Sequence, residues 1–188
     1  MRKEAGVLVV EAQMFAHQAH AEQKQKGKDV PYIVHVEKVV ALLMDVGADE
    51  ETIAAAWLHD VAEDQGVQIG TIRELFGIRV ARMVEDVSEV DKSLSWIVRK
   101  SQTVGHVKTM VHDSLLIKTA DVIANTENMT EDYREKGEAM FEVFHAGKVA
   151  QVEHKQLLVS AIVDAWPLNP LLPQLTSAYQ EFQEVFVV

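Results

Sequence analysis

The stretch Ala55-Ala-Trp-Leu-His-Asp-Val-Ala-Glu-Asp64 decides how this chain is interpreted. The residues from Ile53 to Leu58 are almost all apolar, which is typical of a helix that is buried on every side. Asp49 precedes them as a capping residue, so we predict a helix from Glu50 to about Ala62. The end of this helix carries one imidazole and three carboxylates, and such groups are costly to bury unless each has a partner.

The spacing of these four polar residues suggests a metal site. On a helix, His59 and Glu63 are four residues apart, as are Asp60 and Asp64, so all four lie on adjoining faces within one turn. Three carboxylates at such short range repel or raise one another's pKa. A divalent cation would resolve this conflict. The alternative is that Glu63 and Asp64 are simply the polar end of a helix that runs into a solvated loop.

The rest of the chain has the periodicity of helices. No segment shows the two-residue alternation of a half-buried strand. Glycine, proline and capping residues divide the pattern into helices over about 4–26, 31–46, 50–62, 71–77, 78–87, 91–110, 114–125, 131–165 and 175–185, and Gly147 is a candidate break in the 131–165 helix. We therefore expect an all-α fold, with residues 1–188 forming a single compact multi-helix domain.

Composition excludes several classes of partner and site. Eighteen Lys and Arg against 29 Asp and Glu give a formal charge of −11, which disfavours duplex nucleic acid and anionic membranes. The chain has no cysteine, so a disulfide framework and a thiolate zinc site are excluded. The apolar stretch at 7–10 is too short for a signal peptide, and no run approaches the roughly 20 residues that span a bilayer. We expect a cytoplasmic protein with a small-molecule partner, and the sequence does not indicate its oligomeric state.

A histidine, then His-Asp, then a later aspartate, all within apolar helices, is the ligand order of the HD superfamily of metal-dependent phosphohydrolases. More narrowly, the chain resembles the small alarmone hydrolases, free-standing relatives of the hydrolase domain in RelA/SpoT-type enzymes. The resemblance covers about residues 12–128. The matching segments are Phe15-Ala-His-Gln-Ala-His20, Gln23-Lys-Gln-Lys26, Pro31-Tyr-Ile-Val-His35, Ala55-Ala-Trp-Leu-His-Asp-Val-Ala-Glu-Asp64, Phe76-Gly77, Val84-Glu-Asp-Val-Ser88, Asp91-Lys92, Arg99-Lys100 and Leu116-Ile-Lys-Thr-Ala-Asp121 with Asn125.

This resemblance implies an activity and a set of site residues. Enzymes of the family remove the 3′-pyrophosphate of (p)ppGpp, with Mn²⁺ as the usual metal, and release the nucleoside 5′-di- or triphosphate and pyrophosphate. By position, one ion per chain would be bound by four residues: His35, His59, Asp60 and Asp121. Glu63 and Asp64 would position and deprotonate the attacking water, and Asn125 would line the nucleoside pocket. Two imidazoles and two carboxylates suit Mn²⁺ but also admit Fe²⁺, Co²⁺ and Zn²⁺.

The substrate contacts are where the chain departs from the family. An anionic substrate requires local cations, and the candidates are six basic residues: Lys24, Lys26, Lys28, Lys92, Arg99 and Lys100. We favour Lys26 and Arg99, and the other four are equally well explained as solvated surface charges. The family usually has Arg-Lys where this chain has Gln25-Lys26, and glutamine offers no cationic plane for a base to stack on. An adenine alarmone, (p)ppApp, is therefore open beside (p)ppGpp.

Two other functions fit the same scaffold. One is an HD-type enzyme with another substrate: a 5′-nucleotidase, a nucleoside triphosphatase or a phosphodiesterase. The other is a nucleotide sensor that binds without catalysis. Two features argue against another HD-type substrate: the Glu63-Asp64 pair and the Pro31-Tyr-Ile-Val-His35 segment. The sensor is disfavoured because all of the expected ligands and carboxylates are present.

Overall fold

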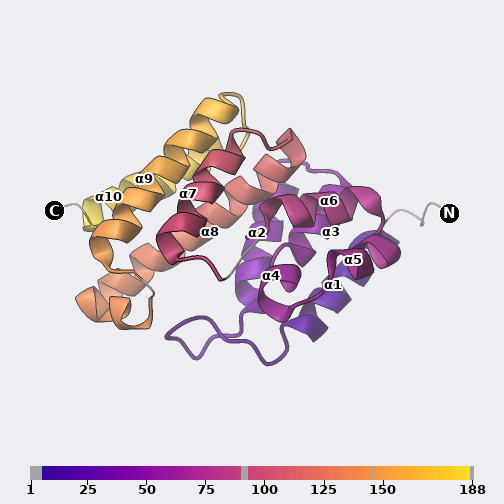
Figure 1. Ribbon diagram of the computed structural model, residues 1–188, viewed down its shortest axis with the longest axis horizontal. Helices are drawn as coiled ribbons and strands as arrows, with labels where there is room; N and C mark the ends of the chain where they lie inside the picture. Colours follow the sequence, from indigo (N-terminus) through magenta and orange to yellow (C-terminus); the bar gives the residue numbers. More distant parts are fainter. Residues whose placement is uncertain (1–5, 90–92, 145, 187–188) are drawn as a thin grey trace.

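A computed structural model describes residues 6–89, 93–144 and 146–186 of the chain (Figure 1). Within these ranges the structure is helical, and its β pairing is one isolated bridge between Lys24 and Pro31. The helices are α1 Val7–Ala19, α2 Ile33–Asp45, α3 Glu50–Leu58, α4 Val61–Gln65, α5 Ile69–Phe76, α6 Ile78–Val87, α7 Trp96–Val107, α8 His112–Lys136, the 3₁₀ helix η1 Gly137–Val143, α9 Lys148–Ala165 and α10 Leu172–Phe186. The all-α prediction is confirmed.

The long helix α8 joins two groups of helices (Figure 1). One group, α1 to α6, is built around α3, which packs against α1, α2, α6 and α8. The other group consists of α9 and α10, which lie along α8, and of α7, which packs on α9. Every residue of α3 from Thr52 to Leu58 is buried, as its apolar sequence predicts. Polar residues at the end of α3 therefore lie deep in the protein.

The predicted helix over 50–62 is interrupted at the motif itself. Helix α3 ends at Leu58, His59 and Asp60 form a turn, and α4 starts again at Val61. The side chain of Asp60 makes no capping hydrogen bond and instead contacts the Tyr32 hydroxyl and the imidazole of His59. Asp60 occupies the N-cap position, and its carbonyl accepts a hydrogen bond of 2.8 Å from the N–H of Asp64. The prediction of one continuous helix is wrong here.

The other large difference concerns α8. We predict a break between 125 and 131, but the helix continues to Lys136. Thr126 and Thr130 donate their hydroxyls to carbonyls one turn earlier, at 2.5 and 2.9 Å, so that these polar groups are satisfied inside a buried face. The helix ends at Gly137, whose φ of 57° suits glycine. Among the described residues, no helix combines the length and apolar character needed to cross a membrane.

Candidate metal centre

Three of the predicted ligands meet where α2, the end of α3 and the middle of α8 converge. His35 comes from α2, His59 follows α3 and Asp121 lies on α8. One ligand atom from each lies within 4.8 Å of the other two, and all three residues are buried. Residues 86 positions apart in the sequence thus form one cluster that can bind a metal ion.

The fourth predicted ligand, Asp60, lies against both imidazoles. Its Oδ2 is 2.9 Å from Nε2 of His59 and 3.7 Å from Nε2 of His35. On the other side, Oδ1 of Asp121 is 3.4 Å from the same His35 nitrogen. The turn at 59–60 makes this possible, because it directs two consecutive side chains toward one point.

The hydrogen bonding of the imidazoles fits a cation. Nδ1 of His59 lies 2.7 Å from the carbonyl of Ala56, which assigns a proton to Nδ1 and directs Nε2 toward Asp60. Among the described residues, the buried Nε2 atoms of His35 and His59 make no hydrogen bond, although carboxylate oxygens lie 3.4 Å and 2.9 Å from them. Burial opposes charge on His59, but Asp60 and Asp121 outweigh it and raise the pKa of His59 to about 9. The centre therefore attracts positive charge, and a divalent ion with nitrogen and oxygen ligands would supply it.

Three polar side chains orient the two carboxylates. The Tyr32 hydroxyl donates to Oδ2 of Asp60 at 2.5 Å, and burial together with the Asp60 charge raises the pKa of Tyr32, so that it stays a donor. Lys118 lies 2.9 Å from Oδ2 of Asp121, and Asn125 donates to its Oδ1 at 2.5 Å. Burial disfavours ionisation of Asp121, but Lys118 and the nearby imidazoles lower its pKa well below the usual range. Both aspartates are thus held as anions.

Glu63 and Asp64 lie on α4 in different surroundings. Oε2 of Glu63 accepts a hydrogen bond of 3.0 Å from the backbone N–H of Glu89. Burial, reinforced by the charge of Asp60, raises the pKa of Glu63 despite that bond. Asp64 is exposed and accepts a hydrogen bond of 2.8 Å from Nε2 of Gln23. The two carboxylates therefore differ, and Glu63 has the environment of a general base.

Gln23 and Tyr32 are site residues that the spacing argument missed. Gln23 is fixed through its own Oε1, which lies 2.6 Å from Nδ1 of His20 and accepts a hydrogen bond of 2.5 Å from Gln65. This leaves its amide nitrogen directed at Asp64. Both residues reach their carboxylates across more than 25 positions of sequence. Lys118 could have been found, because it precedes Asp121 by three residues on one helix.

The predicted substrate contacts are spread more widely. Arg99 and Lys100 both pair with the buried carboxylate of Glu89. Gln25 and Lys26 belong to the segment between α1 and α2, and Lys26 lines a small hollow of about 60 Å³ beside Lys136. In the described part of the chain, no hydrogen bond or ion pair joins either residue to the metal cluster.

The remaining basic candidates are accounted for as follows. Lys28 pairs with Asp132 at 2.8 Å, and Lys24 pairs with Asp29. Lys92 lies outside the described residues. Among the five described cations, Arg99 and Lys100 pair with Glu89, whose backbone N–H donates to the carboxylate of Glu63.

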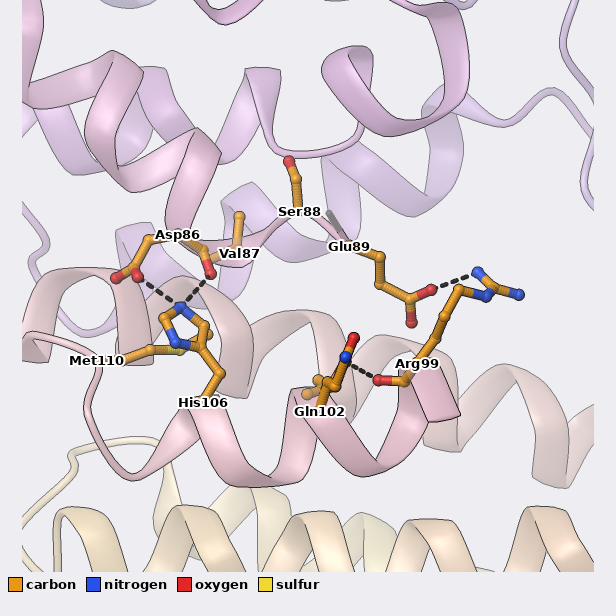
Figure 2. Close-up of a pocket in the computed structure, with 9 residues that line it drawn as sticks. Asp86, Val87, Ser88, Glu89, Arg99, Gln102, His106 and Met110 are labelled. Carbon is orange, nitrogen blue, oxygen red and sulfur yellow. Dashed lines mark hydrogen bonds and ion pairs between the residues drawn. The ribbon is translucent and has the colours of Figure 1, made fainter. Parts of the chain in front are cut away.

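A hollow lies beside this network, between α7 and the residues that follow α6 (Figure 2). Figure 2 shows the His106–Asp86 pair at one end and the Glu89–Arg99 pair at the other. Its volume is about 70 Å³, far below the roughly 300–1,000 Å³ of ligand pockets. It has room for a few waters and not for a nucleotide.

Comparisons with known proteins show the family of the chain. The model of a family described as "HD domain" matches residues 12–147, which include all four predicted ligands. A zebrafish (Danio rerio) protein named guanosine-3′,5′-bis(diphosphate) 3′-pyrophosphohydrolase MESH1 is 35% identical over 125 residues, which cover 65% of this chain and 69% of that protein. A probable guanosine-3′,5′-bis(diphosphate) 3′-pyrophosphohydrolase from Synechocystis is 45% identical over 85 residues. That match covers 45% of this chain but only 11% of the Synechocystis protein.

The fold has a solved counterpart. The structure described as a metazoan ortholog of SpoT that hydrolyses ppGpp superposes with a TM-score of 0.76 over 96% of this chain and 98% of that one. At 23% identity, this likeness concerns the fold. The family model covers well over half of the residues, and the zebrafish protein is matched over more than two thirds of its length. The chain therefore belongs to the HD domain family.

Proposed function

We propose that this protein is a metal-dependent hydrolase that removes the 3′-pyrophosphate of an alarmone nucleotide, (p)ppGpp or (p)ppApp, and releases the nucleoside 5′-di- or triphosphate and pyrophosphate. The observation that carries the proposal is the pair of buried imidazole nitrogens of His35 and His59, which make no hydrogen bond among the described residues and face the carboxylates of Asp60 and Asp121. The names of the zebrafish and Synechocystis relatives support the choice of substrate.

The four residues named above would hold one ion. When bound, a divalent cation supplies Lewis-acid polarisation of a phosphoryl oxygen and makes a nearby water more acidic. We propose Mn²⁺, because two imidazoles and two carboxylates form the mixed nitrogen and oxygen set that this ion accepts. Lys118, Tyr32 and Asn125 would keep the two aspartates oriented toward the ion.

Glu63 would take the proton of the attacking water. Its raised pKa brings it closer to neutral pH, where a general base is most effective. The Glu89 N–H fixes one carboxylate oxygen and so orients the Glu63 side chain. Asp64, held by Gln23, would position the water from the exposed side. Such proton transfer contributes about 10²- to 10⁴-fold in rate.

The contacts to the nucleotide stay predictions. Asn125 is exposed and adjoins Asp121, which suits a residue at the entrance of the site. Gln25 and Lys26 would meet the base and a phosphate, and Arg99 would meet the pyrophosphate after exchange with Glu89. We also propose that residues 1–188 form one domain and that the protein acts in the cytoplasm.

A substrate panel tests the proposal. Purified protein with Mn²⁺ is incubated with ppGpp, pppGpp, ppApp and pppApp, and separately with deoxynucleoside mono- and triphosphates and cyclic nucleotides. Pyrophosphate release from the first group alone supports the proposal, and the preferred base decides between guanine and adenine. Turnover confined to the second group would assign another HD-type activity. Nucleotide binding without turnover under any divalent ion would favour the sensor.

A further inference from the structure

Lys155 is a buried lysine without a partner. It lies on α9 and is 6% exposed. Within the described residues its ammonium makes no hydrogen bond and no ion pair. Gln151, one turn earlier on the same face, is 8% exposed. A largely buried ammonium without a carboxylate partner is costly, and an interaction with a bound anion would compensate for this cost.

The inner face of α9 changes character along its length. Its first half presents Gln151 and Lys155, whereas its second half presents Leu158 and Ile162, which pack in the core. Helix α9 lies along α7 and α8, the helices that carry Lys100 and Lys118 (Figure 1). The polar half of α9 therefore faces the part of the molecule where the metal cluster and its cations lie.

The charged groups of α7 and α8 affect the pKa of Lys155. Burial, together with the charges of Lys100 and Lys118, lowers the pKa of Lys155 to about 8, although Asp121 acts in the opposite sense. The neighbouring His154 packs its ring against Trp96 of α7 at 5.7 Å. Burial and the same lysines lower the pKa of His154 to about 3, so it stays neutral. Lys100 and Lys118 each have a carboxylate partner, and Lys155 has none in the part of the chain that the structure describes.

We propose that Lys155, with Gln151 beside it, binds the phosphate groups of the substrate, so that α9 forms a wall of the pyrophosphate subsite. This inference rests on the proposed function for the identity of the substrate. It places a contact beyond residue 147, where the match to the family model ends. A phosphoryl oxygen would give the buried ammonium the charged acceptor that the protein does not provide.

The test uses Lys155→Met, which keeps the length of the side chain and removes the charge. Lys108→Met is the control, because Lys108 is an exposed lysine at the end of α7. Binding of inorganic pyrophosphate is measured by calorimetry for the full chain, with Mn²⁺ and after its removal, and thermal unfolding is followed in parallel. Lys155→Met should bind pyrophosphate about ten- to a hundredfold more weakly, because a hydrogen bond to a charged group is lost.

Thermal unfolding separates a binding role from a structural one. If Lys155 is retained for binding, its replacement by Met removes an uncompensated buried charge, and the melting temperature should rise by roughly 2–4 °C. Unchanged pyrophosphate affinity would overturn the proposal. A lower melting temperature would also overturn it, because the ammonium would then stabilise the fold. Pyrophosphate binding needs no turnover, so a failure of the proposed hydrolysis would be recognised separately.

Discussion

The site has two sides whose charged groups have different partners. One side is built by α2, α3 and α4, and the other by α7 and α9. On the first, the buried carboxylates of Asp60 and Glu63 are oriented by the Tyr32 hydroxyl and a backbone N–H. On the second, Lys100 pairs with a carboxylate, whereas Lys155 has no partner among the described residues. The first side thus gathers negative charge that suits a cation, and α9 carries positive charge that suits an anion.

The most damaging change should be Asp60→Asn on the carboxylate side. Asparagine keeps the size of the side chain but removes the charge that faces both imidazoles. We expect Mn²⁺ affinity to fall sharply and pyrophosphate release to drop by at least about 10³-fold, because a bound cation contributes several kcal/mol to the transition state. Calorimetry with Mn²⁺ and a pyrophosphate assay measure the two effects.

Asp45→Asn is the matched control, since Asp45 is exposed at the end of α2, the helix that carries His35. It should leave both measurements unchanged. Wild-type Mn²⁺ affinity in the Asp60→Asn protein would remove Asp60 from the ligand set.

Glu63→Gln should come next, because it removes a base and leaves the ligands in place. We expect kcat to fall by about 10²- to 10⁴-fold while Mn²⁺ affinity stays as in the wild type. Steady-state kinetics and a metal titration on the same preparation separate the two. A large loss of metal binding in this variant would mean that Glu63 is a ligand and not a base.

The pH profile sharpens this assignment. Burial and the charge of Asp60 raise the pKa of Glu63, and only the deprotonated form can accept a proton. The kcat of the wild type should therefore fall on the acid side, at a pH above the ordinary range of a glutamate. That acid limb should disappear in Glu63→Gln. Its persistence there would assign it to another group.

The predicted ligands stand out in the sequence because each lies in a short, unusual context. Histidine and aspartate at the end of the apolar run 53–58 are recognisable as costly groups that need a partner. The local path of the chain was not readable. Spacing on a continuous helix predicted one turn of four polar residues, whereas the chain turns at His59 and Asp60. The tertiary contacts of the His59 and Asp60 side chains, which point toward one centre, override the helical pattern there.

The groups that orient the carboxylates were largely beyond sequence reasoning. Tyr32 reaches Asp60 across 28 positions, and Gln23 reaches Asp64 across 41. No local periodicity relates residues at such separations, because the packing of α1, α2 and α3 brings them together. Lys155 was missed for the same reason, since its burial depends on where α9 lies.

A smaller effect is expected from Gln23→Leu, which removes the amide that holds Asp64. If Asp64 positions the water, kcat should fall about tenfold or somewhat more, the range of a hydrogen bond to a charged group, with KM and Mn²⁺ affinity nearly constant. The control is Gln18→Leu, on the exposed face of α1. Equal losses in the two variants would show an effect on α1 and not on Asp64.

The smallest effect should come from an acidic residue away from the site, where charge supports the fold and not the chemistry. Asp49 caps α3 through the N–H of Thr52 at 2.9 Å and pairs with Arg79 at 2.7 Å. Asp49→Ala should lower the melting temperature by roughly 2–4 °C for a cap worth about 1 kcal/mol, and kcat should not change.

The pH dependence of this effect follows from the pKa of Asp49. Partial burial raises this pKa, but the hydrogen bonds from Arg79 and Thr52 outweigh burial and lower the pKa to about 2. A depressed pKa in the folded state stabilises the protein above the unfolded value, so the difference between wild type and variant should shrink as the pH falls from 4 to about 2. A difference that is constant over this interval would show that the cap contributes through its geometry and not its charge.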